Sequence, residues 1–64
     1  MKLYSEDKDF YDLIGEARSQ EKISDDYLTS GQFVTSIYQN EDYIYKLVTD
    51  IDNGIYYSIE KRER

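Results

Sequence analysis

The sequence predicts an α+β fold in which one N-terminal amphipathic helix packs on a three-stranded antiparallel β-meander. Apolar residues recur at helical spacing only in the first third of the chain. From Phe33 onward they alternate with polar residues in segments rich in Ile, Val, Thr and Tyr. The run Asp52-Asn53-Gly54 marks a tight turn between the last two of these segments. A chain of 64 residues is long enough for one small domain and leaves no room for a second, so a single domain is expected over residues 1–64.

The helix is expected over residues 6–20. Ser5 is a suitable N-cap because its hydroxyl can accept a hydrogen bond from a free N–H of the first turn. The apolar stripe that would face the sheet comprises Phe10, Leu13, Ile14 and Ala17. Asp9, Asp12 and Glu16 fall together on one flank of this stripe, so the helix has a charged side as well as an apolar one.

A second, short helical turn is expected over residues 24–30. Ser24 would cap it, and the carboxylates of Asp25 and Asp26 suit the first turn of a helix. Gly31 suits its exit.

The strands of the meander are expected over residues 33–39, 43–51 and 55–60. Two registers compete at the second turn. A two-residue Asn-Gly turn places Leu47 opposite Glu60, whereas a three-residue loop places Leu47 opposite Ile59 and gives the cleaner apolar face. We therefore predict the three-residue loop.

A three-residue loop at 40–42 would likewise pair Ile37 with Tyr45. The tail from Lys61 onward either extends the last strand, which pairs Lys61 with Tyr45, or forms a loose end. The helix-covered face of the sheet would then comprise Phe33, Thr35, Ile37, Tyr43, Tyr45, Leu47, Ile51, Ile55, Tyr57 and Ile59.

The second face of this sheet is expected to carry an apolar cluster that forms a homodimer interface. Its members are Val34, Tyr38, Ile44 and Val48. A solvated antiparallel face normally alternates to polar residues, so an apolar cluster there indicates an association surface. The chain also has eight tyrosines and no disulfide, and small scaffolds without disulfides or metals often gain stability by oligomerising.

The composition argues against catalysis and against bound cofactors. His and Cys are absent, which removes the common nucleophile–base pairs and the usual zinc ligands, so neither catalytic nor metal-binding residues are expected. Residues 50–54 begin like a calcium-binding loop, but Gly54 falls at the fifth position instead of the sixth, and Lys61 stands where a bidentate Glu is needed. The hairpin turn is the better interpretation.

The net charge of −6 predicts the class of partner. A field of this sign repels nucleic acid and anionic membranes and attracts basic protein surfaces. Apolar runs are too short for a transmembrane helix or a signal peptide, so a cytoplasmic protein is expected.

The surface expected to bind this partner combines acidic side chains with aromatic anchors. It comprises Asp9, Asp12, Glu16, Asp25 and Asp26 together with Tyr11, Tyr27 and Tyr38. The shortness, acidity and tyrosine content of the chain resemble the composition of small phage-encoded proteins that bind and disable a host enzyme, including anti-CRISPR and other anti-defence inhibitors.

That resemblance implies a non-enzymatic viral inhibitor that occupies the functional surface of a host defence or nucleic-acid-handling protein. Two alternatives stay open. One is an antitoxin or immunity protein that neutralises a basic toxin by the same electrostatics. The other is a structural or regulatory homodimer with no inhibitory role.

Overall fold

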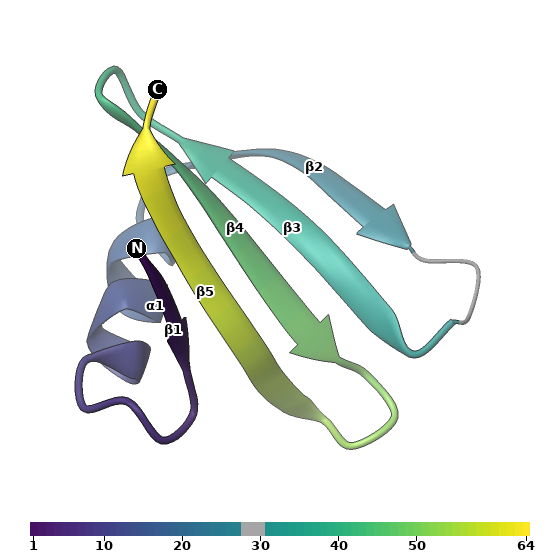
Figure 1. Cartoon of the computed structure of the whole chain (residues 1–64). Helices are drawn as coiled ribbons and strands as arrows, with labels where there is room; N and C mark the ends of the chain where they lie inside the picture. Colours follow the sequence, from purple (N-terminus) through teal and green to yellow (C-terminus); the bar gives the residue numbers. More distant parts are fainter. Residues whose placement is uncertain (28–30) are drawn as a thin grey trace.

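A twisted antiparallel sheet forms one layer of the protein, and a short helix lies behind it (Figure 1). The computed structural model describes residues 1–27 and 31–64, and the side chains of residues 26 and 27 lie outside that description. In chain order the elements are β1 (Lys2–Tyr4), α1 (Phe10–Arg18), β2 (Glu21–Tyr27), β3 (Phe33–Gln39), β4 (Tyr43–Asp50) and β5 (Ile55–Glu63). The described strands form one five-stranded sheet in the order β1-β5-β4-β3-β2.

The predicted three-stranded meander is wrong because a strand is added at each edge of it. β1 pairs with β5 through Leu3 and Ile59, but three residues are too few to show a period in the sequence. β2 occupies the segment where a helical turn was expected to begin, so that prediction is wrong up to Tyr27. The rest of the expected turn, residues 28–30, lies outside the described residues.

The helix is shorter than predicted, and Ser5 is not its N-cap. The backbone N–H of Asp7 donates to the Tyr4 carbonyl at 2.9 Å, and the Tyr4 N–H donates to Asp7 Oδ2 at 2.7 Å. These bonds turn the chain directly after β1, so α1 begins only at Phe10, with Asp9 at the N-cap position. The predicted apolar stripe is confirmed, because Phe10, Leu13, Ile14 and Ala17 are all buried.

The predicted β4–β5 register is confirmed over most of its length, since Leu47 pairs with Ile59 and Lys46 with Glu60. The last strand continues to Glu63, three residues beyond the predicted end at Glu60. A bulge after Val48 shifts the pairing near the turn.

The turn between these strands has the predicted left-handed glycine. Gly54 has φ 68°, a conformation that costs a residue with a Cβ atom about 1–2 kcal/mol. Because of the bulge, Asp50 pairs with Ile55, so the turn comprises residues 51–54 and the predicted three-residue loop is wrong. Ile51 lies in this turn and is exposed.

The predicted β3–β4 register is wrong by one residue. Asn40 N–H donates to the Tyr43 carbonyl at 3.0 Å, and Asn40 Oδ1 accepts from the Tyr43 N–H at 2.8 Å. These bonds close a two-residue loop in place of the predicted three-residue loop. Tyr38 therefore pairs with Tyr45, and Ile37 pairs with Lys46. Because side chains alternate across a strand, this slip exchanges the two faces of β3.

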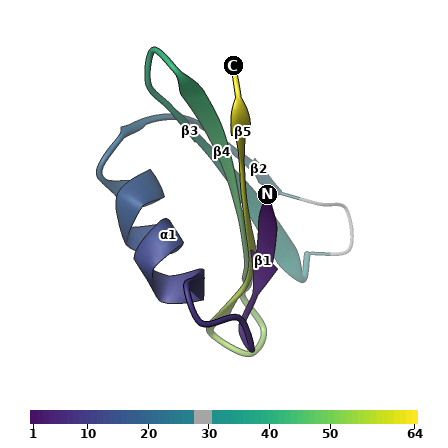
Figure 2. The ribbon, with the colours of Figure 1, turned by 60° about the vertical axis from the view of Figure 1, so that its left-hand side comes forward.

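The core lies between α1 and one face of the sheet (Figure 2). Its buried members are Phe10, Leu13, Ile14, Ala17, Tyr38, Tyr45, Leu47 and Ile59. No described helix or strand covers the opposite face, which we call the open face. The solvent-accessible surface of the chain is 4429 Å². A compact monomer of this mass is expected to expose about 4,300 Å², so the fold reaches ordinary compactness without a partner.

Side-chain hydrogen bonds fix the position of the helix over the sheet. Arg18 Nη1 donates to the Tyr56 hydroxyl on β5 at 2.7 Å. Beyond the end of α1, Gln20 Nε2 donates to the Glu16 carbonyl at 3.1 Å, and Gln20 Oε1 accepts from Asn40 at 3.3 Å. No helix in the described part of the chain has the length and apolar character needed to cross a membrane.

Candidate functional site

The three carboxylates that the sequence places on one flank of the helix line a single groove. We call it the acidic groove. It lies between α1, β1 and β5, has a volume of about 210 Å³, and is lined by Met1, Leu3, Asp9, Asp12, Leu13, Glu16 and Lys61. Helical spacing brings the carboxylates together. The sequence did not reveal the other wall of the groove, because that wall depends on β1.

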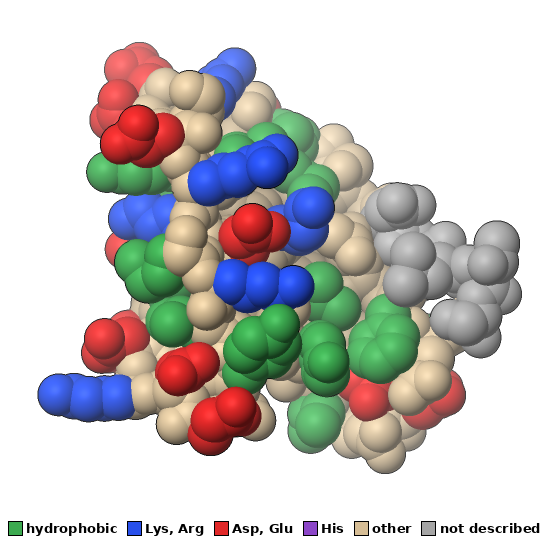
Figure 3. Space-filling model, in the orientation of Figure 1, with side chains coloured by type: hydrophobic (Ala, Val, Ile, Leu, Met, Phe, Trp, Pro, Cys, Tyr) green, Lys and Arg blue, Asp and Glu red, His purple; other side chains and the backbone are tan. Residues whose placement is uncertain are grey.

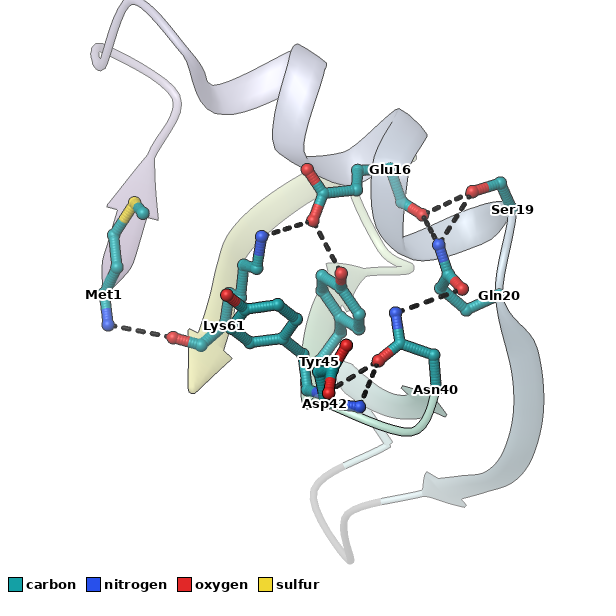
Figure 4. Close-up of polar contacts among 9 residues, drawn as sticks. Met1, Glu16, Ser19, Gln20, Asn40, Asp42, Tyr45 and Lys61 are labelled. Atoms are coloured by element: carbon teal, nitrogen blue, oxygen red, sulfur yellow. Dashed lines mark hydrogen bonds and ion pairs between the residues drawn. The ribbon is translucent and has the colours of Figure 1, made fainter. Parts of the chain in front are cut away.

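Glu16 is held by two donors from the sheet (Figure 4). Lys61 Nζ lies 2.6 Å from Glu16 Oε2, and the Tyr45 hydroxyl donates to the same oxygen at 2.6 Å. Tyr45 is buried, with 1% of its surface exposed, so its hydroxyl needs this partner. The ammonium group of Lys61 also lies 4.1 Å from the centre of the Tyr43 ring, within the range of a cation–π contact.

These contacts shift the pKa values of all three groups. The hydrogen bond from Lys61, followed by that from Tyr45, holds the pKa of Glu16 below its usual value. The same bond to Glu16 raises the pKa of Lys61, and burial followed by the hydrogen bond to Glu16 raises the pKa of the Tyr45 hydroxyl. The trio therefore holds one negative and one positive charge at neutral pH.

Asp9 and Asp12 are the two carboxylates of the acidic groove that form no ion pair within the described residues. Both residues are exposed. Asp9 lies at the N-cap position of α1, and Asp12 lies in its first turn. At the other end of the groove, the N-terminal ammonium group donates to the Lys61 carbonyl at 2.9 Å and the Lys61 N–H donates to the Met1 carbonyl at 2.8 Å. The groove thus holds three carboxylates, Asp9, Asp12 and Glu16, against the two cationic groups of Met1 and Lys61, a net charge of −1, and it presents the exposed side chains of Asp9 and Asp12 to a cationic group.

The other acidic residues predicted to bind the partner do not join this groove. Asp25 lies on β2, at the opposite edge of the sheet from β1. Its carboxylate accepts a hydrogen bond from Ser36 at 2.6 Å and lies 2.6 Å from Lys22 Nζ. The hydrogen bond with Lys22, followed by that from Ser36, lowers the pKa of Asp25. The side chain of Asp26 lies outside the described residues.

The three tyrosines predicted as anchors also separate. Tyr11 is 67% exposed on α1, where its ring meets Phe10 edge-on at 5.0 Å. Tyr38 is buried in the core and is not available to a partner. The side chain of Tyr27 lies outside the described residues.

The four residues predicted to form a dimer interface lie on two different faces. Val34 and Tyr38 are buried on the helix side, whereas Ile44 and Val48 alternate with the core residues of β4 and lie on the open face. The one-residue slip of β3 is the cause of this separation.

The open face carries an aromatic cluster that the sequence did not predict. The Tyr57 ring lies edge-on between Tyr4 at 5.9 Å and Phe33 at 5.3 Å, and 48% of Tyr57 is exposed. Tyr4 belongs to β1, a strand that was not predicted from the sequence. Phe33 was predicted to lie on the helix-covered face. The three residues of β1 are too few for the sequence to have indicated this strand.

A band of charged side chains crosses the open face beside this cluster. Lys2, Glu60 and Lys46 are consecutive partners on β1, β5 and β4, and Arg62 lies one row farther along β5. Figure 3 shows hydrophobic side chains in the lower half of this face and Lys and Arg side chains above them, with one acidic side chain between the basic ones. Further acidic side chains lie at the upper left and along the lower margin.

No family model matches the chain, and comparisons with curated proteins and with solved structures find no match. Across residues 1–27 and 31–64, no three His, Cys, Asp or Glu side chains are grouped so that they could hold a metal ion.

Proposed function

We propose that this protein is a small non-enzymatic binding protein that acts by occupying a basic functional surface of a protein partner. The observation that supports this most directly is the acidic groove, where Asp9 and Asp12 stand exposed on a helix whose position is fixed by the sheet. A guanidinium or ammonium group of a partner would meet both carboxylates there, and charge-assisted hydrogen bonds are the strong ones.

The charge of the whole chain supports the same partner class. A net charge of −6 on 64 residues raises the encounter rate with a basic surface and lowers it with nucleic acid. Basic surfaces of this kind occur on proteins that handle nucleic acids. Together with the resemblance of the composition to small phage-encoded inhibitors, this favours a specific form of the proposal, a phage-type inhibitor that blocks a host defence or nucleic-acid-handling protein.

The test uses isosteric charge removal in the groove. Wild-type protein on a resin should capture a stoichiometric basic partner from a bacterial host lysate, and the purified partner should lose activity when the protein is added. The Asp9→Asn/Asp12→Asn variant should bind that partner about tenfold or more weakly, because each lost charged contact costs on the order of 1 kcal/mol.

The matched control is Glu41→Gln/Glu63→Gln. Both residues are exposed at the far end of the sheet, and this variant loses the same two charges. If the two double variants weaken binding equally, only the net charge matters and the groove has no specific role. A partner that is bound but keeps its full activity argues against inhibition. A captured basic toxin would instead identify the protein as an antitoxin.

A further inference from the structure

We infer that Asn53 is a site of spontaneous covalent modification, at which the side-chain amide is converted to a carboxylate through a cyclic imide, and that the Asp50 carboxylate sets the rate of this reaction in the folded chain. The inference does not depend on the proposed function, because the β4–β5 turn (Figure 1) contains none of the residues that line the acidic groove.

Asn53 meets the two conditions that the reaction requires. It is exposed in the turn between β4 and β5, so water reaches its side chain. It is followed by Gly54, and the nitrogen of a glycine is the least shielded backbone nucleophile because the residue has no side chain. Open space surrounds the position where a Cβ atom of Gly54 would lie. Both the electrophile and the nucleophile are therefore accessible in the folded turn.

The reaction balances with water as its co-reactant. The backbone nitrogen of Gly54, after losing its proton to the solvent, attacks Cγ of Asn53. A bond forms between these atoms, the bond between Cγ and Nδ2 breaks, and Nδ2 leaves as ammonia with a proton taken from water. Water then opens the cyclic imide at either carbonyl carbon. The product is an aspartate at position 53 or an isoaspartate, in which the backbone runs through Cβ and Cγ.

The carboxylate of Asp50 restrains the reacting amide. Asn53 Nδ2 donates to Asp50 Oδ2 at 2.7 Å, and the backbone N–H of Asn53 donates to Asp50 Oδ1 at 3.3 Å. One carboxylate therefore ties the side chain to the N-terminal side of its residue, whereas the attacking nitrogen of Gly54 lies on the C-terminal side. The side chain must give up a charge-assisted hydrogen bond before Cγ meets that nitrogen.

Asp50 is itself fixed in position and ionised. It is buried, with 6% of its surface exposed. The hydrogen bond from the Asn53 side chain holds the pKa of Asp50 below its ordinary value of 3.8. At neutral pH Asp50 therefore has no proton to give to the leaving nitrogen. Both the restraint and the missing proton slow the reaction in the folded chain.

Conversion of Asn53 changes the turn in a defined way. A carboxylate oxygen replaces the donor Nδ2, which lies 2.7 Å from Asp50 Oδ2, so two negative groups face each other where a hydrogen bond was. The product adds one negative charge to the net charge of −6. An isoaspartate also lengthens the backbone beside Gly54, whose φ is 68°. The modified chain should therefore have a weaker β4–β5 turn.

Asn40, the other asparagine of the chain, provides a comparison within the same molecule. It also lies in a hairpin turn, but it is half-buried and is followed by Glu41, whose side chain shields the peptide nitrogen. Its Oδ1 accepts from the N–H groups of Asp42 and Tyr43 at 2.9 Å and 2.8 Å. Asn40 should therefore stay unmodified while Asn53 is converted.

Incubation of the wild-type chain at neutral pH tests the inference without any variant. Peptide mapping by mass spectrometry should detect, at Asn53, the mass increase of replacing NH₂ by OH, and anion exchange should resolve a species with one more negative charge. In guanidinium chloride, where the bond to Asp50 is lost, the conversion should be about tenfold faster or more. A folded chain that keeps Asn53 intact after the unfolded chain is fully converted would overturn the inference. Equal conversion at Asn40 in the folded chain would overturn it as well.

A matched pair of variants tests the role of Asp50. Asp50→Ala should convert Asn53 about tenfold faster or more than the folded wild type, because rotation of the amide no longer breaks a hydrogen bond to a charged group. Asp52→Ala removes an exposed carboxylate from the same turn and should leave the rate unchanged. If the two variants have equal rates, the role given to Asp50 is wrong. If circular dichroism shows that Asp50→Ala is unfolded, Asp50→Asn replaces it, since that change keeps the shape and removes the charge.

The effect on the turn is tested with the product itself. Asn53→Asp should lower the melting temperature by about 4 °C or more, because it sets two carboxylates against each other. Asn40→Asp makes the same change in the other turn but keeps both bonds that Oδ1 accepts, so it should lower the melting temperature less. Equal shifts would show that the contact with Asp50 is not what the modification disrupts.

Discussion

Replacing Tyr45 by Phe should destabilise the protein measurably, although it removes a single oxygen atom. The Tyr45 hydroxyl lies in the core and donates to Glu16 Oε2 at 2.6 Å. A hydrogen bond to a charged group contributes about 1.5–3 kcal/mol to stability. The Glu16 side chain is 42% exposed and keeps Lys61, so the lower end of that range applies, about 1.5 kcal/mol.

This loss is large for so small a domain. A 64-residue chain is expected to have a free energy of unfolding of about 3–10 kcal/mol. A change of 1 kcal/mol shifts the melting temperature of a domain of this size by roughly 4–8 °C. Tyr45→Phe should therefore lower the melting temperature by about 6–12 °C. Urea unfolding gives the same difference in free energy, with an unchanged slope if the folded state stays intact.

Tyr43→Phe is the matched control. Tyr43 is half-buried on the same strand and on the same face, and its ring keeps the cation–π contact with Lys61 when the hydroxyl is removed. Within the described residues, no hydrogen bond involves the Tyr43 hydroxyl, so its loss should cost less than about 0.5 kcal/mol. Equal losses for the two variants would refute the assignment of the Tyr45–Glu16 bond as a stabilising contact.

A double-mutant cycle with Glu16→Gln sharpens the test. If the hydroxyl acts through the carboxylate, Tyr45→Phe should cost less in the Glu16→Gln background than in the wild type. An unchanged cost would show that the hydroxyl is stabilised by something other than the charge of Glu16.

The remaining predictions concern pH and two of the glycines, Gly15 and Gly54. The pKa values of Glu16, Asp25 and Asp50 lie below their ordinary values of 4.5, 3.8 and 3.8, so the unfolded chain binds more protons than the folded one in acid. The stabilisation that these three carboxylates contribute is fully present above about pH 5 and is lost as the pH falls through 4 toward 2. Urea unfolding at a series of pH values should show this loss of stability. A free energy of unfolding that does not change with pH would contradict it. Gly15→Ala, in the exposed middle of α1 with open space around its Cβ position, should raise stability by about 0.5–1 kcal/mol. Gly54→Ala should lower it by about 1–2 kcal/mol, because φ is 68° there, and thermal melts that rank the two variants in the opposite order would refute both assignments.

The sequence predicted the parts of the fold that depend on local chemistry. The apolar stripe of α1 was found from its spacing, and the β4–β5 register was found from the left-handed Gly54 and the match of Leu47 with Ile59. Helical spacing also predicted that the three carboxylates of the acidic groove lie on one flank of the helix. In each case the information lies within a few neighbouring residues.

The edge strands could not be read in this way. β1 has three residues, and β2 carries several charges and one bulge, so neither shows the alternation of a typical strand. Each becomes a strand because a neighbouring strand offers unpaired backbone groups, and that neighbour is distant in the chain. Lys2 pairs with Glu60, for example, across most of the sequence.

The faces of β3 illustrate the same limit. Both registers of the first hairpin leave apolar residues on each face, with Val34 and Tyr38 on one side and Phe33 and Ile37 on the other. The side chain of Asn40 closes a two-residue loop and selects the register. Because a slip of one residue exchanges the faces, this short turn also decides which residues form the open face.

By itself, the amino-acid order determined a helix with one apolar side and one acidic flank, a hairpin at Gly54, and a strongly negative chain without thiol or imidazole chemistry. Tertiary structure alone decided that five strands form the sheet, that Lys61 and Tyr45 hold Glu16, and that Tyr4, Phe33 and Tyr57 meet on the open face. The physical reason is range: spacing and turn chemistry act between near neighbours, whereas pairing at the sheet edges joins residues that only the folded chain brings together.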